Sequence, residues 1–240
     1  MVGAMSDKPV CVVVGIGPGN GAAFARRFAR DGYRVALLAR SKGTSEDLVK
    51  EIGSDKARFF DCDASDPASI ARAFGAIEKE LGPPAVVVYN AGSGTWGTFE
   101  SIKLEDFEAS WRVNALGLLA TAKAVAPSMK KAGKGAIVVI GATATRRGGA
   151  KTAAFAPAKA AQKSLCESMA KSLGPAGIHV SIIIIDGVVD LPRTRSHMPD
   201  KPDSFFVRPD DVADLAAYLA KQERSAWTFE AEARPFGETW

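Results

Sequence analysis

The chain reads VGIGPGNG at residues 14–21, between an apolar run and a helical pattern. A strand that turns into a helix here presents unpaired backbone N–H groups and the positive end of the helix dipole at one point. Glycine has no Cβ, so a phosphate can approach the backbone closely. A tight turn alone does not need four glycines, so the pattern predicts a dinucleotide-binding turn. The residues expected to contact the dinucleotide are Gly15, Gly17, Gly19, Asn20 and Gly21.

Short runs rich in β-branched residues recur along the chain, at residues 10–14, 34–38, 85–89, 136–140 and 179–185, with a weaker one at 57–60. Each is too short for a helix and is typical of a strand buried on both faces. Helical patterns separate these runs, at residues 20–31, 66–81, 104–131, 152–173 and 209–221. The alternation predicts right-handed crossovers and an α/β fold, a Rossmann-like doubly wound parallel sheet flanked by helices on both faces.

One dinucleotide-binding domain is expected over residues 1–240, because no linker interrupts the alternation. Asp66 followed by Pro67 is a favourable helix start. Residues 227–236 alternate in polarity and are expected to form a closing edge strand. Residues 191–206 are rich in proline and charge, which predicts a mobile loop beside the substrate.

Composition narrows the class of partner. The net charge is +4, but the lysines and arginines are scattered, so a small-molecule substrate is expected and a nucleic acid is not. The three cysteines lie far apart without metal-ligating spacing, which predicts no metal site and a reducing compartment. No run approaches the ~20 apolar residues of a membrane span, and the first residues lack the apolar core of a signal peptide. A cytoplasmic location without membrane contact is therefore expected.

The end of the second predicted strand indicates which dinucleotide binds. A carboxylate there would bind the ribose 2′-hydroxyl of NAD, whereas a basic group favours the 2′-phosphate of NADP. The chain reads LARSK at residues 38–42, so Arg40 with Ser41 and Lys42 offers a phosphate site and no carboxylate. NADP(H) is therefore favoured. NAD(H) is the alternative if Arg40 is only a solvated charge at a strand end.

Further motifs fall at the ends of predicted elements. They are Asp63 after the 57–60 run, Asn90-Ala91-Gly92 after the 85–89 run, Asn114 in one long helix and Lys159 in the next. Gly15, Gly19 and Gly21 also fit the pattern T-G-x-x-x-G-x-G, with Val14 in place of its threonine. With these motifs in this order, the chain from about residue 9 to its end resembles the short-chain dehydrogenase/reductase family, in its short one-domain form.

This resemblance implies roles for individual residues. Asp63 would contact the adenine, and Asn90, Ala91 and Gly92 would lie along the cofactor. Asn114 would take part in a proton relay, and Lys159 would bind ribose hydroxyls. The resemblance also places Gly187 and Val188 beside the nicotinamide, and it implies a homodimer or a homotetramer.

The catalytic pair of the family is missing. Phe155 stands where the resemblance implies a tyrosine, and Ala142 stands where it implies a serine. A phenyl ring cannot transfer a proton, and alanine cannot hydrogen-bond a carbonyl oxygen. Proton transfer contributes ~10²–10⁴-fold to such reactions, or roughly 3–5 kcal/mol of barrier. Asp186 and Leu191 replace the family's proline and threonine after the last core strand, which weakens the expected grip on the nicotinamide.

Neighbouring groups offer a partial replacement. Thr143 and Thr145 follow Ala142 closely, and either hydroxyl can supply the hydrogen bond of the missing serine. Neither is acidic enough to replace a tyrosine, so Lys159 is the candidate proton donor, directly or through water held by Asn114. Hydrogen bonding of both threonines within their own loop is the alternative, and the favoured one.

Four other side chains have weaker claims. His179 begins an apolar strand, so a structural role is expected, and His197 is expected to be a solvated surface residue. Trp96 and Phe99 are candidates for the wall of a substrate cleft, with core packing or a subunit contact as equal alternatives.

The leading hypothesis from sequence is an NADP(H)-dependent oxidoreductase with an atypical active site, which moves hydride to or from a small carbonyl, alcohol or activated double bond. A non-catalytic dinucleotide-binding sensor or scaffold is the alternative that Phe155 and Ala142 suggest. A third is another chemistry on the same fold, such as dehydration or isomerisation.

Overall fold

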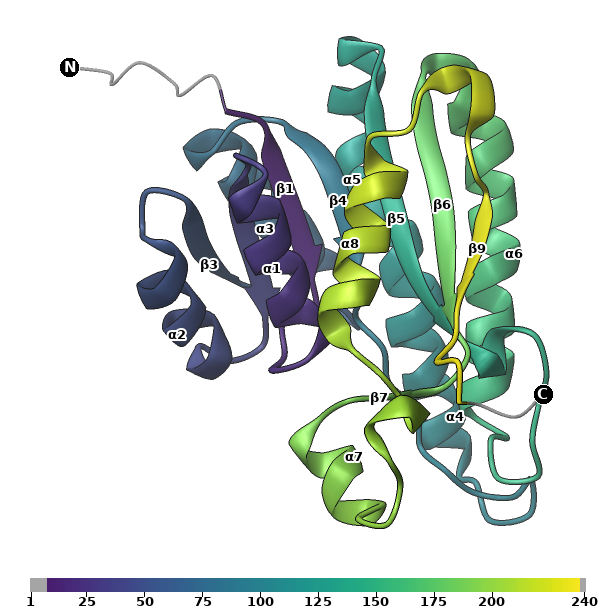
Figure 1. Cartoon of the computed structure of the whole chain (residues 1–240). Helices are drawn as coiled ribbons and strands as arrows, with labels where there is room; N and C mark the ends of the chain where they lie inside the picture. Colours follow the sequence, from purple (N-terminus) through teal and green to yellow (C-terminus); the bar gives the residue numbers. More distant parts are fainter. Residues whose placement is uncertain (1–7, 238–240) are drawn as a thin grey trace.

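The computed structural model describes residues 8–237, so the ends of the expected domain, residues 1–7 and 238–240, lie outside the described residues. Within the described part, seven parallel strands form one sheet in the order β3-β2-β1-β4-β5-β6-β9 (Figure 1). The strands are β1 (Val10–Val14), β2 (Arg34–Ala39), β3 (Ala57–Asp61), β4 (Pro84–Tyr89), β5 (Gly135–Ala142), β6 (Ile178–Ile185) and β9 (Glu230–Ala233). This is a Rossmann-like doubly wound sheet, as the alternating pattern predicted.

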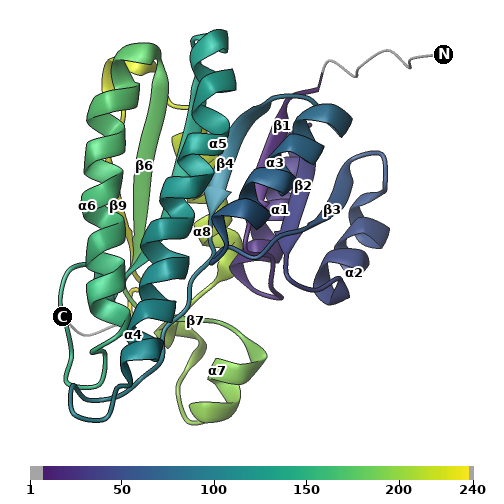
Figure 2. The same cartoon turned by 180° about the vertical axis from the view of Figure 1, so that it is seen from behind.

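Helices cover both faces of the sheet, as Figures 1 and 2 show from opposite sides. They are α1 (Asn20–Arg30), α2 (Gly43–Ile52), α3 (Pro67–Glu80), α4 (Leu104–Trp111), α5 (Gly117–Ala132), α6 (Phe155–Leu173), α7 (Pro192–His197) and α8 (Pro209–Ala220). One core cluster joins the sheet to α1, α2 and α8, and the other joins it to α3, α5 and α6. Because central strands such as β1 and β6 are buried on both faces, their side chains can be apolar at almost every position.

Local sequence explains where several helices begin. Phe24 and Phe28 lie one turn apart on α1 and are fully buried against the sheet. Helix α3 begins at the expected place, where the Asp66 carboxylate accepts hydrogen bonds from the backbone N–H groups of Ala68 and Ser69 at 2.9 and 3.1 Å. Pro67 occupies the first turn of that helix, where it costs no hydrogen bond.

The expected helix over residues 104–131 is interrupted. A five-residue π-helical segment, Arg112–Leu116, separates α4 from α5. Two of its backbone carbonyls receive side-chain donors, because the Tyr89 hydroxyl donates to Val113 and the Gln162 amide donates to Asn114. Periodicity of apolar residues cannot show such long-range partners, so the sequence predicted an uninterrupted helix.

The alternation of strands and helices predicts a helix between β2 and β3, but the apolar pattern gives no residue range for this helix, α2. Only Leu48, Val49 and Ile52 supply it with apolar contacts to the core. So few apolar residues in a ten-residue helix give a weak periodic signal. The expected helix over residues 152–173 begins three residues later, at Phe155.

The C-terminal part contains two features singled out from the sequence, an edge strand and the segment of residues 191–206. Strand β9 pairs in parallel with β6, which confirms the expected closing edge strand. The 191–206 segment, expected as a loop, contains helix α7 and a 3-10 turn at Asp203–Phe205. Arg195, within this segment, forms an ion pair at 2.7 Å with Asp190, which precedes the segment, and another at 2.6 Å with Asp203 inside it. The expectation that the segment is mobile stays a prediction.

Candidate functional site

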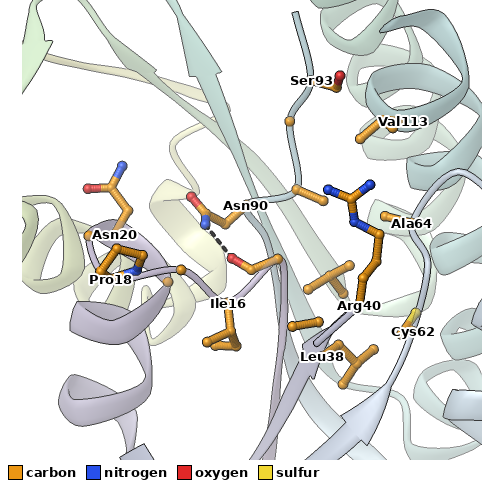
Figure 3. Close-up of a pocket in the computed structure, with 18 of the residues that line it drawn as sticks. Ile16, Pro18, Asn20, Leu38, Arg40, Cys62, Ala64, Asn90, Ser93 and Val113 are labelled. Carbon is orange, nitrogen blue, oxygen red and sulfur yellow. Dashed lines mark hydrogen bonds between the residues drawn. The ribbon is translucent and has the colours of Figure 1, made fainter. Parts of the chain in front are cut away.

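A cavity of about 490 Å³ lies at the carboxyl ends of β1, β2 and β4, where the strand order reverses. Ligands of open α/β sheets bind at this switch point. Figure 3 shows the cavity between the glycine-rich turn and the β2 end. The lining residues are Val14, Gly15, Ile16, Gly17, Pro18, Gly19, Asn20, Gly21, Leu38, Ala39, Arg40, Ser41, Cys62, Asp63, Ala64, Asn90, Ala91, Gly92, Ser93, Val113, Val189 and Leu191.

The glycines of the turn serve different purposes. Gly15 has a φ of +96°, and a Cβ there would lie 2.5 Å from the backbone nitrogen of Ala91. A Cβ on Gly21 would lie 2.6 Å from the Gly15 carbonyl oxygen, so both positions are set by packing of the backbone. A Cβ on Gly17 would meet no atom within 4 Å, and one on Gly19 would meet only the Leu191 side chain. The turn is therefore closed toward the protein, open toward the cavity at Gly17 and covered by the Leu191 side chain at Gly19.

The β2 end supplies a positive charge. Figure 3 shows the exposed Arg40 side chain extending across the cavity toward Ala64 and Val113. Asp63 follows β3 beside it, and its Oδ1 accepts hydrogen bonds from the Ser65 backbone N–H at 2.8 Å and hydroxyl at 2.7 Å. These hydrogen bonds, with a smaller contribution from the charge of Arg40, hold the pKa of Asp63 below its usual value. Asp63 is thus a fixed carboxylate, and Arg40 is the cation that reaches into the cavity.

Asn90 connects the ends of β1 and β4. Its side-chain Nδ2 donates to the Gly15 carbonyl at 2.7 Å, and its backbone N–H donates to Val14 at 2.9 Å (Figure 3). Ala91 and Gly92 continue from it along the cavity wall. The motif therefore fixes the glycine-rich turn as well as lining the cavity.

Lys159 and Asn114 meet beside Gly92. A Cβ on Gly92 would lie 3.6 Å from the Nζ of Lys159 and 3.6 Å from the Oδ1 of Asn114. Lys159 is buried, and its ammonium donates to the Ile140 carbonyl at 2.9 Å and to Gln162 Oε1 at 3.1 Å. Burial lowers the pKa of Lys159 to about 8, against a small opposing effect of the Cys166 thiol. Lys159 is therefore an acid of suitable strength near neutral pH.

Asn114 is fully buried, and its side chain is fixed by donation from Nδ2 to the backbone carbonyls of Ser93 at 2.7 Å and Ser110 at 2.8 Å. Its Oδ1 has no hydrogen-bond partner in the structure. A buried acceptor without a partner is costly, so this oxygen is suited to receive a donor from a bound molecule or water.

Phe155 stands at the start of α6 between Lys159 and an aromatic neighbour. The centre of its ring lies 6.0 Å from Lys159 Nζ and 6.0 Å from the ring of Trp96. The ring also packs against Gly94, where a Cβ would collide with it. Trp96 and Phe99 are 69% and 80% exposed, so neither belongs to the core. The wall beside Lys159 is apolar where a phenolic hydroxyl would be needed for proton transfer.

Both threonine hydroxyls have protein partners. Thr143 donates to the Asp186 carboxylate at 2.5 Å, and that carboxylate also pairs with Arg234. The Thr145 hydroxyl accepts a hydrogen bond from the Ala142 backbone N–H at 2.9 Å. The geometry corresponds to the loop-bonding alternative for Thr145, whereas Thr143 bonds outside its loop, to the carboxylate that follows β6.

The structure separates some expected site residues from the cavity. Gly187 packs against Pro235 and Val207, and neither it nor Val188 is among the residues that line the cavity. Val189 and Leu191 line it instead. No motif points to these two, because their place depends on the path of the chain after β6.

Both histidines lie away from the cavity lining. His179 contacts the backbone carbonyls of Leu219 and Thr228 at 3.1 and 2.9 Å, and it stacks on Trp227 with ring centres 4.9 Å apart. This is the structural role expected for it. His197 is exposed on α7 and contacts the Arg193 carbonyl at 2.6 Å.

Residues 8–237 contain no group of three or more His, Cys, Asp or Glu side chains placed to hold a metal ion. None of the described helices combines the length and apolar character that crossing a bilayer requires.

The fold and the cavity define a protein with a nucleotide-type cleft at the switch point of a doubly wound sheet. Residues 9–201 match the family model described as short chain dehydrogenase. The chain therefore belongs to the short-chain dehydrogenase/reductase family, which is a family of oxidoreductases.

Individual relatives resemble the chain over most of its length. D-threitol dehydrogenase of Mycolicibacterium smegmatis is 29% identical over 224 residues, which cover 89% of this chain and 86% of the relative. Inactive 2-(S)-hydroxypropyl-CoM dehydrogenase 2 of Xanthobacter autotrophicus is 30% identical over 208 residues, which cover 81% and 90%. A metagenomic short-chain oxidoreductase, solved in complex with NADP, superimposes with a TM-score of 0.82 at 30% identity and covers 96% of this chain and 98% of that one.

Proposed function

We propose that this chain is an NADP(H)-dependent oxidoreductase with an atypical active site, acting on a small carbonyl, alcohol or activated double bond. The single observation that carries the proposal is the cavity with the open glycine-rich turn on one side and Arg40 on the other. Arg40 suits the 2′-phosphate that distinguishes NADP from NAD. The metagenomic relative solved with NADP supports the same cofactor, with NAD(H) as the alternative.

The residues that line the cavity, together with Lys159, Gly187 and Val188 outside its lining, would follow such a ligand in order along its length. Arg40 and Ser41 would hold the 2′-phosphate, and Asp63 would contact the adenine. The backbone of the turn would hold the pyrophosphate, through the residues Gly15, Gly17, Gly19, Asn20 and Gly21. Asn90, Ala91 and Gly92 would lie along the middle of the ligand, and Lys159 would bind the ribose hydroxyls next to the nicotinamide. Gly187 and Val188 are proposed to lie near the nicotinamide itself.

When bound, NADP(H) supplies or accepts the hydride. The chain must then supply or remove one proton, and Phe155 cannot do so. We assign this role to Lys159, whose pKa of about 8 keeps it mostly protonated at neutral pH, directly or through water at Asn114. Thr143 and Thr145 are the remaining hydroxyls near Ala142, and the role proposed for them is to shape the loop through their protein partners.

A second candidate function is a non-catalytic dinucleotide-binding sensor or scaffold. The observation that favours it is the apolar pair Phe155 and Ala142 at the positions of the family's catalytic tyrosine and serine. One relative bears the word inactive in its name, which fits the same interpretation.

Two measurements test these candidates. The first is fluorescence titration of the purified protein with NADPH and with NADH, where tighter binding of NADPH is expected. Equal affinity for both, or no binding, contradicts the cofactor proposal.

The second measurement is turnover of a carbonyl panel by the wild type and by the double variant Phe155→Tyr, Ala142→Ser. The variant is expected to gain about 10²-fold because a phenol and a hydroxyl are restored. Normal binding of NADPH without any gain favours the sensor or scaffold.

We also propose that the chain forms a homodimer or a homotetramer. Large apolar side chains are exposed on α4, on α5 and on the segment before them, at Trp96, Phe99, Leu104, Phe107, Trp111 and Leu119. Several large exposed apolar side chains within one stretch of chain suit a surface that another protein covers. Light scattering of the protein in solution tests this proposal, and a monomer at micromolar concentration contradicts it.

The remaining proposals concern place and motion. The three cysteines are free and buried, which suits the reducing cytoplasm proposed as the location.

The 191–206 segment is proposed to move over the bound ligand, since Leu191 contacts the glycine-rich turn at Gly19. Hydrogen exchange of this segment with and without NADPH tests the motion.

A further inference from the structure

Gln162 is a fully buried side chain on α6 that makes two hydrogen bonds to site residues. Its Oε1 accepts from Lys159 Nζ at 3.1 Å, and its Nε2 donates to the Asn114 backbone carbonyl at 3.1 Å. The orientation of the amide follows from chemistry, because an ammonium can only donate and a carbonyl can only accept. Gln162 therefore joins the two polar residues that meet beside Gly92.

The bond to Gln162 restricts what Lys159 can do. An ammonium has three N–H donors, and two of them are used by the Ile140 carbonyl at 2.9 Å and by Gln162. One donor remains for a ligand. Gly92 lines the cavity, and a Cβ on it would lie 3.6 Å from Nζ, so this is the side on which a ligand can reach Lys159.

Asn114 is restricted in a complementary way. Its backbone carbonyl accepts a hydrogen bond from the Gln162 amide, and its Nδ2 donates to the backbone carbonyls of Ser93 and Ser110. Its Oδ1 has no hydrogen-bond partner among residues 8–237. That oxygen would lie at the same distance from a Cβ on Gly92 as Lys159 Nζ would. One spare donor and one spare acceptor therefore lie beside Gly92, which lines the cavity although Lys159 and Asn114 themselves do not. Such a pair suits a hydroxyl group, since a hydroxyl both donates and accepts.

We propose that Gln162 is a positioning residue, which holds Lys159 and Asn114 so that this donor and acceptor bind a hydroxyl on the nicotinamide half of the dinucleotide. The inference rests on the proposed function, since the ligand is NADP(H). Gln162 itself touches no ligand and acts only through its two neighbours. An apolar side chain would fill the same buried space without polar groups to satisfy, so the amide is needed for its hydrogen bonds.

Substitutions of Gln162 separate positioning from simple packing. Gln162→Leu keeps the approximate size and removes both hydrogen bonds. Gln162→Glu keeps an acceptor for Lys159 and adds a negative charge. Met169→Ala is the matched control, because Met169 is also buried on α6 but its side chain is part of the apolar core.

The first measurement is calorimetric titration with NADPH and with adenosine 2′,5′-bisphosphate, which lacks the nicotinamide half. For Gln162→Leu we expect the Kd of NADPH to rise at least tenfold and the Kd of the bisphosphate to stay within twofold. Met169→Ala is expected to leave both constants within twofold. Equal weakening of both ligands, or of neither, in Gln162→Leu overturns the positioning role.

The second measurement is an NMR titration of the Lys159 side chain, assigned with Lys159→Gln, in the absence of any ligand. Loss of an acceptor disfavours the charged ammonium, and an added carboxylate favours it. The pKa of Lys159 is therefore expected to fall in Gln162→Leu and to rise in Gln162→Glu. Shifts in the same direction, or none, overturn the proposal. Because no ligand is present, this result stands even if NADPH does not bind and the proposed function fails.

Discussion

Two regions lie at the carboxyl ends of the strands of one sheet, the cavity at β1 and β2 and the region where β5 meets α6. Their polar groups differ, because in one region they face the cavity and in the other they are bonded to protein. At β1 and β2, Gly17 and Arg40 face open space and are available to a ligand. Where β5 meets α6, Thr143 and Thr145 are bonded to protein, and the wall beside Lys159 is the ring of Phe155.

This difference follows from what carries each function. Dinucleotide binding depends on backbone placement, and the backbone of the turn is packed so closely at Gly15 and Gly21 that few substitutions are tolerated. Proton transfer depends on individual side chains, which can be replaced without disturbing the sheet. A chain can therefore keep the family's fold and cleft while its catalytic side chains change.

The largest effect is expected for Gly15→Ala, on the side of the molecule that depends on the backbone. The substitution places a Cβ 2.5 Å from Ala91 and at a φ of +96°. Together the steric clash and the unfavourable backbone should lower the free energy of unfolding by about 2–5 kcal/mol. Gly17→Ala is the control, because its Cβ meets no atom within 4 Å. Urea denaturation measures both, and equal stability of the two variants contradicts the comparison.

Arg40→Ala tests the charge on the same side. Loss of charge-assisted hydrogen bonds to a phosphate costs about 1.5–3 kcal/mol, so NADPH binding should weaken roughly 10–100-fold. Binding of NADH should stay unchanged. Arg30→Ala, which removes an exposed arginine paired with Asp214, serves as the control for net charge. A parallel loss of NADPH and NADH affinity in Arg40→Ala would show that the 2′-phosphate lies elsewhere.

Lys159→Met tests the region where β5 meets α6, through the dependence of the free energy of unfolding on pH. The pKa of Lys159 is lowered to about 8 in the folded chain, from 10.5 when unperturbed. Between these values the unfolded lysine holds a proton that the folded one has lost, so this residue makes the fold more stable as pH rises. The wild type should gain about 1.6 kcal/mol relative to Lys159→Met between pH 8 and pH 9.5. Urea unfolding at both pH values measures the difference in free energy of unfolding between the two proteins. If this difference does not change with pH, the pKa of Lys159 is not lowered in the folded chain.

The smallest effect is expected for Thr145→Val, which removes the hydroxyl that accepts from Ala142. The free energy of unfolding should fall by about 1 kcal/mol, and NADPH affinity should not change. Denaturation combined with an NADPH titration checks both parts. A large loss of turnover at normal stability would instead give Thr145 a part in catalysis.

The sequence predicted the fold and the cavity through different signals. Short apolar runs gave the central strands, because strands buried on both faces must be apolar throughout. The glycine-rich turn was predicted from its motif, because a phosphate-binding turn has a local mechanism, and Asp63 was predicted from the family resemblance. The dinucleotide contacts themselves remain predictions.

The parts that the sequence did not reveal depend on contacts between distant residues. Gln162 belongs to no motif, and although Lys159 lies three positions before it on α6, its other partner, the Asn114 backbone carbonyl, lies 48 positions away. Leu191 reaches the turn only because the chain after β6 folds back over it. The link between Thr143 and Asp186 likewise joins residues 43 positions apart.

The π-helical segment Arg112–Leu116 connects the site to the outer surface. Each residue of an α-helix advances the direction of its side chains by about 100°. Deleting one residue from this widened turn would keep both flanking helices but rotate α4 by about that angle against α5. Phe107 and Trp111 would then face another direction while Asn114 lost its alignment with Gly92. A single backbone irregularity thus sets both the angular position of the exposed aromatic surface and the position of a buried amide in the cavity wall.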